Sequence, residues 1–284
     1  MLTRSILFRR FGSTATAVAQ APKEDIEGLE KYWEKALNWY NIYNSRLSLK
    51  AYRTIAPFLQ LDKAKKVLEI GGGTGSGAEI LIPQLTSSAT YTLTDHIECF
   101  LKVAKEKNLP NTEVLKVVPS HLPFAGESFD RFIALATIEE LETTKKVLSE
   151  AYRVLQPGGI IGASVTGKRE ADNYRVISEH VRQKFGIVSP LRFRSDLKNT
   201  GMIKRMFNEA GFHKTFMFYE NITFKSNSIE ELKSFFLQEP SLAEQPIEIK
   251  QKIDNYIEKE LVNLLRVEET PLATDFLLII GFKL

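Results

Sequence analysis

The sequence has few of the residues that build disulfide frameworks and metal centres. It contains a single cysteine, Cys99, so no internal disulfide can form. Its four histidines lie far apart and near no cysteine cluster, and no zinc-binding motif is present. The sequence therefore predicts neither a disulfide scaffold nor a structural metal.

Long apolar runs and basic clusters are also missing. No stretch approaches the roughly 18 uninterrupted apolar residues that predict a membrane-spanning helix. The body of the chain has no basic cluster interleaved with aromatic residues, which is the pattern typical of nucleic-acid-binding surfaces. We therefore expect neither a membrane span nor a nucleic-acid partner.

The excess positive charge is concentrated at the N-terminus. Residues 1–20 contain Arg4, Arg9, Arg10 and no acid, and on a helix these arginines would lie near one another with apolar residues on the other side. The whole chain has a formal net charge of +3, so the remainder is close to neutral. We interpret residues 1–20 as a transit peptide and expect a mitochondrial protein, located in the matrix; the alternative is a disordered basic tail.

A helical periodicity follows a polar linker. Between residues 24 and 60, apolar residues recur every three or four positions, which predicts two helices forming an N-terminal helical cap. This segment carries both tryptophans and four of the tyrosines. They either pack the helices on the main domain or form a lid over a ligand. In the second case Tyr40 and Tyr43 would line the acceptor pocket, and the acceptor would be apolar or aromatic.

From Lys65 onward, strand-like and helical runs alternate, and residues 61–284 are expected to form the main domain. The strand-like runs are residues 66–70, 90–95, 112–118, 131–137, 159–165, 214–224 and 275–284, and helical runs include 77–85, 98–107 and 143–155. Alternation at this spacing implies right-handed crossovers and a mainly parallel, doubly wound α/β sheet.

An insertion at about residues 227–274 separates the last two strands. Ser228 followed by Glu231 can form a capping box for the helix that begins there. A second run repeats apolar residues every four positions from Ile249 to Leu265, which predicts an amphipathic helix. Its apolar stripe is expected to face the core rather than a partner.

The most informative stretch is the glycine-rich turn after the first strand, residues 67–77 (VLEIGGGTGSG). A P-loop is excluded, because Ala78 and Glu79 stand where Lys and Ser/Thr belong. The dinucleotide fingerprint has Ser76 in place of its third glycine. It would also bring the carboxylate of Glu69 near a pyrophosphate, where like charges repel.

A cationic ligand without phosphate removes this conflict. S-adenosyl-L-methionine (SAM) carries an amino group that Glu69 can attract, directly or through water. Glycines let the backbone approach such a ligand without a Cβ clash. Asp95, at the end of the next strand, can accept hydrogen bonds from both ribose hydroxyls.

Here the chain resembles a known family. The pattern Glu69-x-Gly71-x-Gly73-x-Gly75, then Asp95 and the segments LPFAGESFD (122–130) and EAYRVLQPGG (150–159), are similar to successive motifs of class I SAM-dependent methyltransferases. The nearest group is the methyltransferase-11 type, which includes ubiquinone/menaquinone-biosynthesis C-methyltransferases. The resemblance runs from about Trp33 through the strand at 159–165. It implies a Rossmann-like, seven-stranded sheet with the last strand antiparallel.

The resemblance also implies a set of cofactor-binding residues, and this chain departs from the family pattern at one position. The expected cofactor-binding residues are Glu69, Gly71, Gly72, Gly73, Gly75, Asp95, His96, Ser120 and Leu135. Relatives usually place an aspartate, which holds the adenine amino group, where this chain has Val118. A valine cannot accept that hydrogen bond, so Ser120 or a backbone carbonyl would have to replace it. His96 could stack on adenine or lie on the surface.

Methyl transfer needs positioning more than a dedicated acid or base, and the sequence displays no catalytic dyad. Glu139 and Glu140 are candidates for the substrate side of the site; the alternative is a solvated helix start. The expected function is methyl transfer from SAM to a small-molecule acceptor in mitochondria. The alternative is a catalytically inactive, methyltransferase-like subunit or assembly factor of a mitochondrial respiratory complex. Intact Glu69 and Asp95 favour the first, and Val118 and the helical insertion favour the second.

Overall fold

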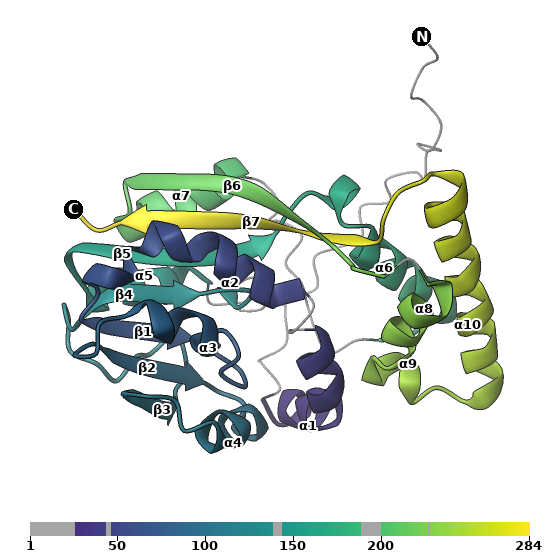
Figure 1. Ribbon diagram of the computed structural model, residues 1–284, viewed down its shortest axis with the longest axis horizontal. Helices are drawn as coiled ribbons and strands as arrows, with labels where there is room; N and C mark the ends of the chain where they lie inside the picture. The colour runs from purple at the N-terminus through teal and green to yellow at the C-terminus, as the bar shows by residue number, and fades with distance from the viewer. Residues whose placement is uncertain (1–25, 44–46, 139–143, 189–199, 227) are drawn as a thin grey trace, which may run out of the picture.

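The computed structural model describes residues 26–43, 47–138, 144–188, 200–226 and 228–284. Within them, one sheet carries helices on both faces, and a further group of helices lies beyond one end of its strands (Figure 1).

The sheet has seven strands in the order β3-β2-β1-β4-β5-β7-β6. The strands are β1 (Lys66–Ile70), β2 (Thr90–Asp95), β3 (Thr112–Lys116), β4 (Phe129–Ala134), β5 (Leu155–Thr166), β6 (Lys214–Thr223) and β7 (Ala273–Phe282). Strands β1 to β5 pair in parallel, whereas β7 is antiparallel to both of its neighbours, β5 and β6. This confirms the predicted Rossmann-like, doubly wound α/β fold with an antiparallel last strand.

The helices follow the predicted alternation. The α-helices are α1 (Ile26–Tyr43), α2 (Leu49–Ile55), α3 (Ala78–Leu81), α4 (Glu98–Glu106), α5 (Thr144–Val154), α6 (Asn173–Phe185), α7 (Thr200–Ala210), α8 (Ile229–Leu237), α9 (Pro240–Ala243) and α10 (Ile247–Val262). Shorter turns of helix are η2 (Ala56–Leu59), η3 (Leu61–Lys63), η4 (Ile82–Gln84), η6 (Arg169–Ala171) and η8 (Asn263–Val267).

Two hydrophobic layers hold the helices on the sheet. Because side chains alternate along a strand, Val67 points into the layer under α2, α3 and α4, and Leu68 points into the layer under α5 and α7. Both are fully buried. Strand β1, in the middle of the sheet, is therefore covered on both faces, as expected for parallel strands.

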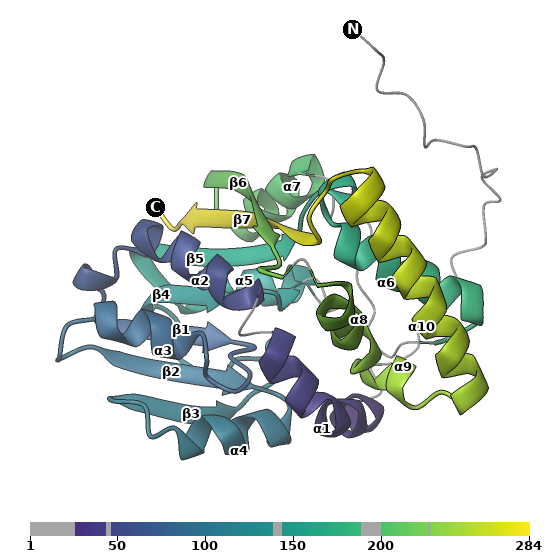
Figure 2. The ribbon, with the colours of Figure 1, turned by 45° about the vertical axis from the view of Figure 1, so that its right-hand side comes forward.

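Helices α6, α8, α9 and α10 form the group beyond the strand ends (Figures 1 and 2). The Ser228 side chain caps α8 by accepting the backbone N–H of Glu231 at 3.3 Å, as the capping signal predicts. Ile253, Ile257 and Leu261 of α10 are fully buried in the same layer as α2 and α8. The predicted core role of this stripe is thus confirmed.

Helix α1 lies between α4 and α9 in both views (Figures 1 and 2) and contacts both. Its buried Trp33, Ala36 and Trp39 form a separate small cluster with Ile97 and Phe100, at the start of α4. The aromatic segment therefore packs on the domain, close to the carboxyl ends of β1 and β2.

Several boundaries differ from the sequence prediction: β3 ends at Lys116 rather than at residue 118, β4 spans Phe129–Ala134 rather than 131–137, and β7 spans Ala273–Phe282 rather than 275–284. Strand β5 begins at Leu155, directly after α5, and not at residue 159. Residues 156–159 of β5 are passed over in its pairing with β4, because the register shifts between the pairs Phe129–Leu155 and Arg131–Ile160. The described parts of the chain contain no helix long and apolar enough to cross a membrane, and no cluster of three or more metal-binding side chains.

Candidate cofactor site

The glycine loop leaves β1 and turns back at once. Gly71 and Gly73 have φ angles of 61° and 54°, in the left-handed region that favours glycine. The N–H of Gly72 donates to the Thr94 carbonyl at 3.0 Å, and that of Gly75 donates to the Gly72 carbonyl at 3.0 Å. The loop is therefore held against the end of β2, with its backbone close to neighbouring side chains.

Glu69 lies beneath this loop. It shares a sheet face with Val67, so its side chain points toward α2, and it is fully buried. Its two carboxylate oxygens accept hydrogen bonds from the hydroxyls of Tyr52 and Tyr91, each at 2.8 Å. Burial raises the pKa of Glu69 to about 7, although both tyrosine hydrogen bonds act to lower it. Glu69 is thus a carboxyl group that titrates near neutral pH.

Asp95 ends β2 on the same face. Its oxygens accept the backbone N–H of Gly73 and that of Ile97, each at 2.9 Å. Burial raises the pKa of Asp95, while the nearby His96 and these N–H bonds oppose the shift. A carboxylate has about four acceptor positions, so Asp95 can still accept a hydroxyl. His96 lies beside it, with its Nδ1 3.8 Å from a carboxylate oxygen of Asp95.

Tyr40 of α1 covers the loop from the other side. Its ring stacks on Phe100, with centroids 4.4 Å apart, and meets the edge of Trp33 at 5.5 Å. A Cβ on Gly73 would overlap the Tyr40 hydroxyl. Thr74 adds a second contact by donating its hydroxyl to Asn41 at 3.3 Å. The structure thus brings Tyr40 to the predicted cofactor loop.

Helix α1 also forms a hydrogen bond and an ion pair with the helical insertion. The Tyr32 hydroxyl donates to the buried carboxylate of Glu239 at 2.6 Å. One turn further on, Lys35 pairs with Glu244 at 2.7 Å. The same helix therefore touches the glycine loop and the helices beyond the strand ends.

The end of β4 supplies the remaining wall. Leu135 is buried, with 4% of its surface exposed. Thr137 approaches Gly71 so closely that a Cβ there would overlap its side chain. Thr137 donates to the Leu135 carbonyl at 3.0 Å, and Ala136 donates its N–H to Ser164 at 2.8 Å. Glu139 and Glu140 lie outside the described residues, as does the side chain of Tyr43.

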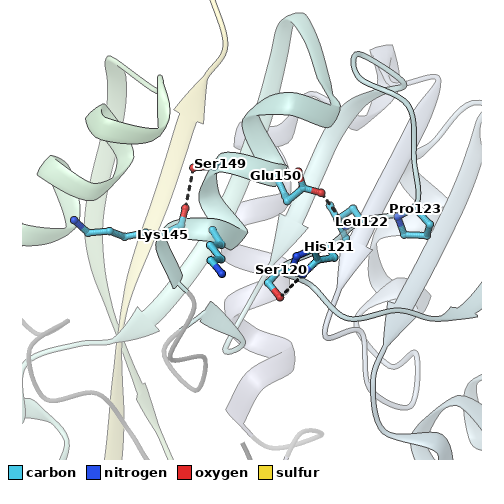
Figure 3. A pocket seen from close by; sticks show the side chains of 8 residues that line it. Ser120, His121, Leu122, Pro123, Lys145, Ser149 and Glu150 are labelled. Atoms are coloured by element: carbon cyan, nitrogen blue, oxygen red, sulfur yellow. Dashed lines mark hydrogen bonds between the residues drawn. The ribbon is translucent and has the colours of Figure 1, made fainter. Parts of the chain in front are cut away.

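Ser120 lies in a different hollow, of about 630 Å³, between the β3–β4 loop and α5 (Figure 3). Its hydroxyl is 3.1 Å from Nδ1 of His121, and the neighbouring Leu122 N–H donates to Glu150 at 2.8 Å. Ser120 is the one predicted cofactor residue among the described residues lining this hollow. Val118, two residues earlier, is half exposed, and its carbonyl accepts the N–H of His121 at 3.0 Å.

Three residues of the site were not predicted: Tyr52, Tyr91 and Thr137. Tyr91 could have been predicted from the parallel pairing of β1 with β2. Glu69 lies opposite Leu93, and Tyr91 is two residues before Leu93, so its side chain is on the same face of the sheet as that of Glu69. Tyr52 and Thr137 come from a helix and a strand end whose positions follow only from the assembled fold.

The chemistry of the site fits a cationic ligand better than a phosphate. Two buried carboxyl groups flank the loop, and among the described residues hydroxyl and backbone N–H groups bond them, rather than lysine or arginine. A phosphate would meet uncompensated negative charge, whereas an amino group would meet acceptors. Glu69, Asp95 and the glycines are therefore the residues able to hold SAM.

Comparisons with known proteins agree with this geometry. Residues 68–163 match the family described as "Methyltransferase domain". The demethylmenaquinone methyltransferase of Listeria monocytogenes is 25% identical over 207 residues, which cover 66% of this chain and 87% of that protein. Among solved structures, phosphoethanolamine N-methyltransferase 2 of Haemonchus contortus, with phosphomonomethylethanolamine and S-adenosylhomocysteine bound, is 18% identical with a TM-score of 0.59. The similarity covers 92% of this chain and 59% of that one.

The fold alone does not determine the reaction. The cyclase SpnF is 15% identical, with a TM-score of 0.59, over 94% of this chain and all of that one. The domain match is the more specific finding, because it covers the end of β1 with Glu69, the glycine loop and Asp95. Residues 68–163 thus resemble a methyltransferase domain, the chain has the Rossmann-like fold of the solved SAM-dependent methyltransferases, and SAM is the cofactor that these findings support.

Proposed function

We propose that this protein transfers a methyl group from SAM to a small-molecule acceptor in mitochondria. The observation that carries the proposal is the methyltransferase-domain match over residues 68–163, which includes both carboxylates and the whole glycine loop. When bound, SAM supplies a methyl group on a sulfonium that a nucleophile can displace in line.

The protein's own contribution is binding and positioning. Asp95 is placed to accept ribose hydroxyls, because its two N–H bonds fix the carboxylate at the end of β2. Above its pKa of about 7, Glu69 supplies negative charge beneath the loop for the amino group. Tyr40 limits the space above Gly73. Holding the reactants in line can lower the barrier by about 7–11 kcal/mol; an acceptor that is methylated in place of a hydrogen must also release that proton, to a base or to water.

The acceptor that we propose is apolar and aromatic, of the quinol type. Two observations support it. Aromatic rings of Trp33, Tyr40 and Phe100 pack together beside the loop. The relative in Listeria monocytogenes acts, by its name, on demethylmenaquinone.

The test starts with calorimetric titration of the purified protein with SAM. Methyl-labelled SAM is then offered with demethylmenaquinol, phosphoethanolamine and a simple amine in parallel. We expect SAM to bind and label to enter the quinol. Binding with transfer only to phosphoethanolamine or the amine would contradict the acceptor class, and absence of SAM binding would contradict the enzymatic role.

A null strain separates the enzyme from a non-catalytic subunit of a mitochondrial complex. Gly73→Val would drive a side chain into Tyr40 and into a φ of 54°. At normal protein abundance, an enzyme should lose function, whereas a structural subunit should still support its complex. Full rescue at normal abundance would reject the enzymatic role. Import is tested by locating a fusion of residues 1–20 to a reporter, with Arg4, Arg9 and Arg10 replaced by glutamine as the control.

A further inference from the structure

Strand β6 is the edge of the sheet farthest from β3 (Figure 1). Aromatic side chains are exposed along it. Phe216 is 51% exposed and Tyr219 36%. Phe58 of η2, itself 41% exposed, extends the patch; its ring lies 5.9 Å from that of Phe216 and 5.2 Å from that of Phe218. Exposed aromatics gathered on one edge indicate a contact surface.

The backbone of this edge has no second strand partner among the described residues. In the described part of the chain, β6 pairs with β7 over all ten of its residues and with no strand on its other side. A long, flat, apolar edge is a template for pairing with another strand. Natural sheets often interrupt such an edge with a bulge, and here the pairing of β6 with β7 runs without interruption.

The sequence of the strand is self-complementary. Residues 214–220 read KTFMFYE. On either side of Met217 stand a phenylalanine, then a residue with a hydroxyl group, then a charged residue, and the two charges have opposite sign. If two copies pair antiparallel with Met217 opposite Met217, Lys214 lies opposite Glu220 and Phe216 lies opposite Phe218. Each opposed pair then joins complementary side chains.

The faces agree with this register. Lys214, Phe216, Phe218 and Glu220 share one face of the strand because they are two residues apart, and this is the face that Phe58 contacts. Within one copy Glu220 already pairs with Lys50 at 3.1 Å, so its carboxylate would lie between two lysines in the pair.

We propose that a second copy of this chain docks on β6, by antiparallel pairing about a two-fold axis at Met217, so that the two sheets become continuous. Charge complementarity selects a second copy over an unrelated strand, because the same seven residues provide both members of each charged pair. Strands β4, β5 and β7 separate this edge from β1, so the glycine loop stays accessible in the dimer.

Charge reversal in the full-length chain tests the register. Sedimentation velocity of the wild type at micromolar concentrations should show a dimer. Lys214→Glu would place two carboxylates opposite each other at both ends of the pairing, and Glu220→Lys would place two ammonium groups there. Each variant alone should self-associate at least about tenfold more weakly. Lys225→Glu, an exposed charge reversal beyond the end of the strand, is the matched control and should dimerise as the wild type does.

Mixing the two variants is the decisive step. In a mixed pair, both ends again join opposite charges, so an equimolar mixture should regain the dimer mass. The double variant Lys214→Glu/Glu220→Lys should also dimerise, and it replaces the mixture if one single variant does not fold. A monomeric wild type, dimers unaffected by either reversal, or a mixture or double variant that stays monomeric would each overturn the proposal.

Discussion

The pKa of Glu69 predicts an unusual pH dependence of stability. This carboxyl is fully buried, and its pKa rises from 4.5 to about 7 on folding. Between these values the folded protein holds a proton that the unfolded chain releases. Stability is therefore lost as the pH rises through this window, and the effect levels off above pH 7.

The magnitude follows from the two pKa values. A difference of one pKa unit corresponds to about 1.4 kcal/mol. With the folded pKa near 7, the titration of Glu69 lowers the free energy of unfolding of the wild type by about 2.5 kcal/mol between pH 5 and pH 8. Glu69→Gln keeps the size of the side chain and removes this titration. The variant should therefore gain about 2.5 kcal/mol relative to wild type over that interval.

Urea unfolding of both proteins without ligand, at pH 5, 6, 7 and 8, measures this difference directly. The amide of the variant turns one tyrosine hydroxyl from donor to acceptor. This lowers the stability of the variant by the same amount at every pH, so the change of the stability difference with pH is unaffected. Tyr91→Phe is the control: it removes a hydrogen bond that lowers the pKa of Glu69, so its stability should begin to level off at a higher pH. A wild-type-minus-variant difference that does not change with pH would refute the reasoning.

Three further predictions concern other sites. Asp95→Asn should weaken SAM binding about tenfold and lower the free energy of unfolding by about 1–3 kcal/mol, because the N–H of Gly73 or of Ile97 loses its acceptor. Calorimetry measures the affinity and urea unfolding measures the stability. An unchanged affinity would remove Asp95 from the site. Lys233→Met should destabilise the α8–α10 contact by about 1 kcal/mol, less at high salt, because the lysine joins three partly exposed carboxylates; equal unfolding curves in low salt would contradict this. The mature protein from mitochondria should begin between about residues 12 and 22, by the usual length of transit peptides; N-terminal sequencing that finds the initiator methionine would contradict cleavage.

The strands of the sheet could be predicted from the sequence because each strand is specified by neighbouring residues. Each strand appears as a short apolar run, and the crossovers follow from alternation with helices. The start of β5 at Leu155 was missed, since it depends on how β4 and β5 pair around a register shift. No residue pattern within one strand carries that information.

The candidate site could be predicted only in part, because some of its residues come from elements whose positions are not specified by neighbouring residues. Glu69, the glycines and Asp95 follow one another along adjacent strands, so their proximity can be derived from the topology. Tyr52 reaches Glu69 from α2, and Tyr40 reaches Gly73 from α1. Both positions depend on how the N-terminal helices dock, which the periodicity of the segment does not specify.

This docking has a consequence for acceptor choice. Helix α1 contacts the glycine loop through Tyr40 and the insertion through Tyr32, whose hydroxyl is bonded to the buried Glu239. A group that enters above Gly73 must therefore displace or contact α1, and α1 cannot shift without disturbing its bond to α9. The proposed cofactor residues Glu69 and Asp95 lie on the sheet, within the matched residues 68–163, whereas we expect the walls facing an acceptor to come from α1 and the helical insertion. We therefore expect acceptor specificity to reside in the parts of this chain that the methyltransferase-domain match does not cover.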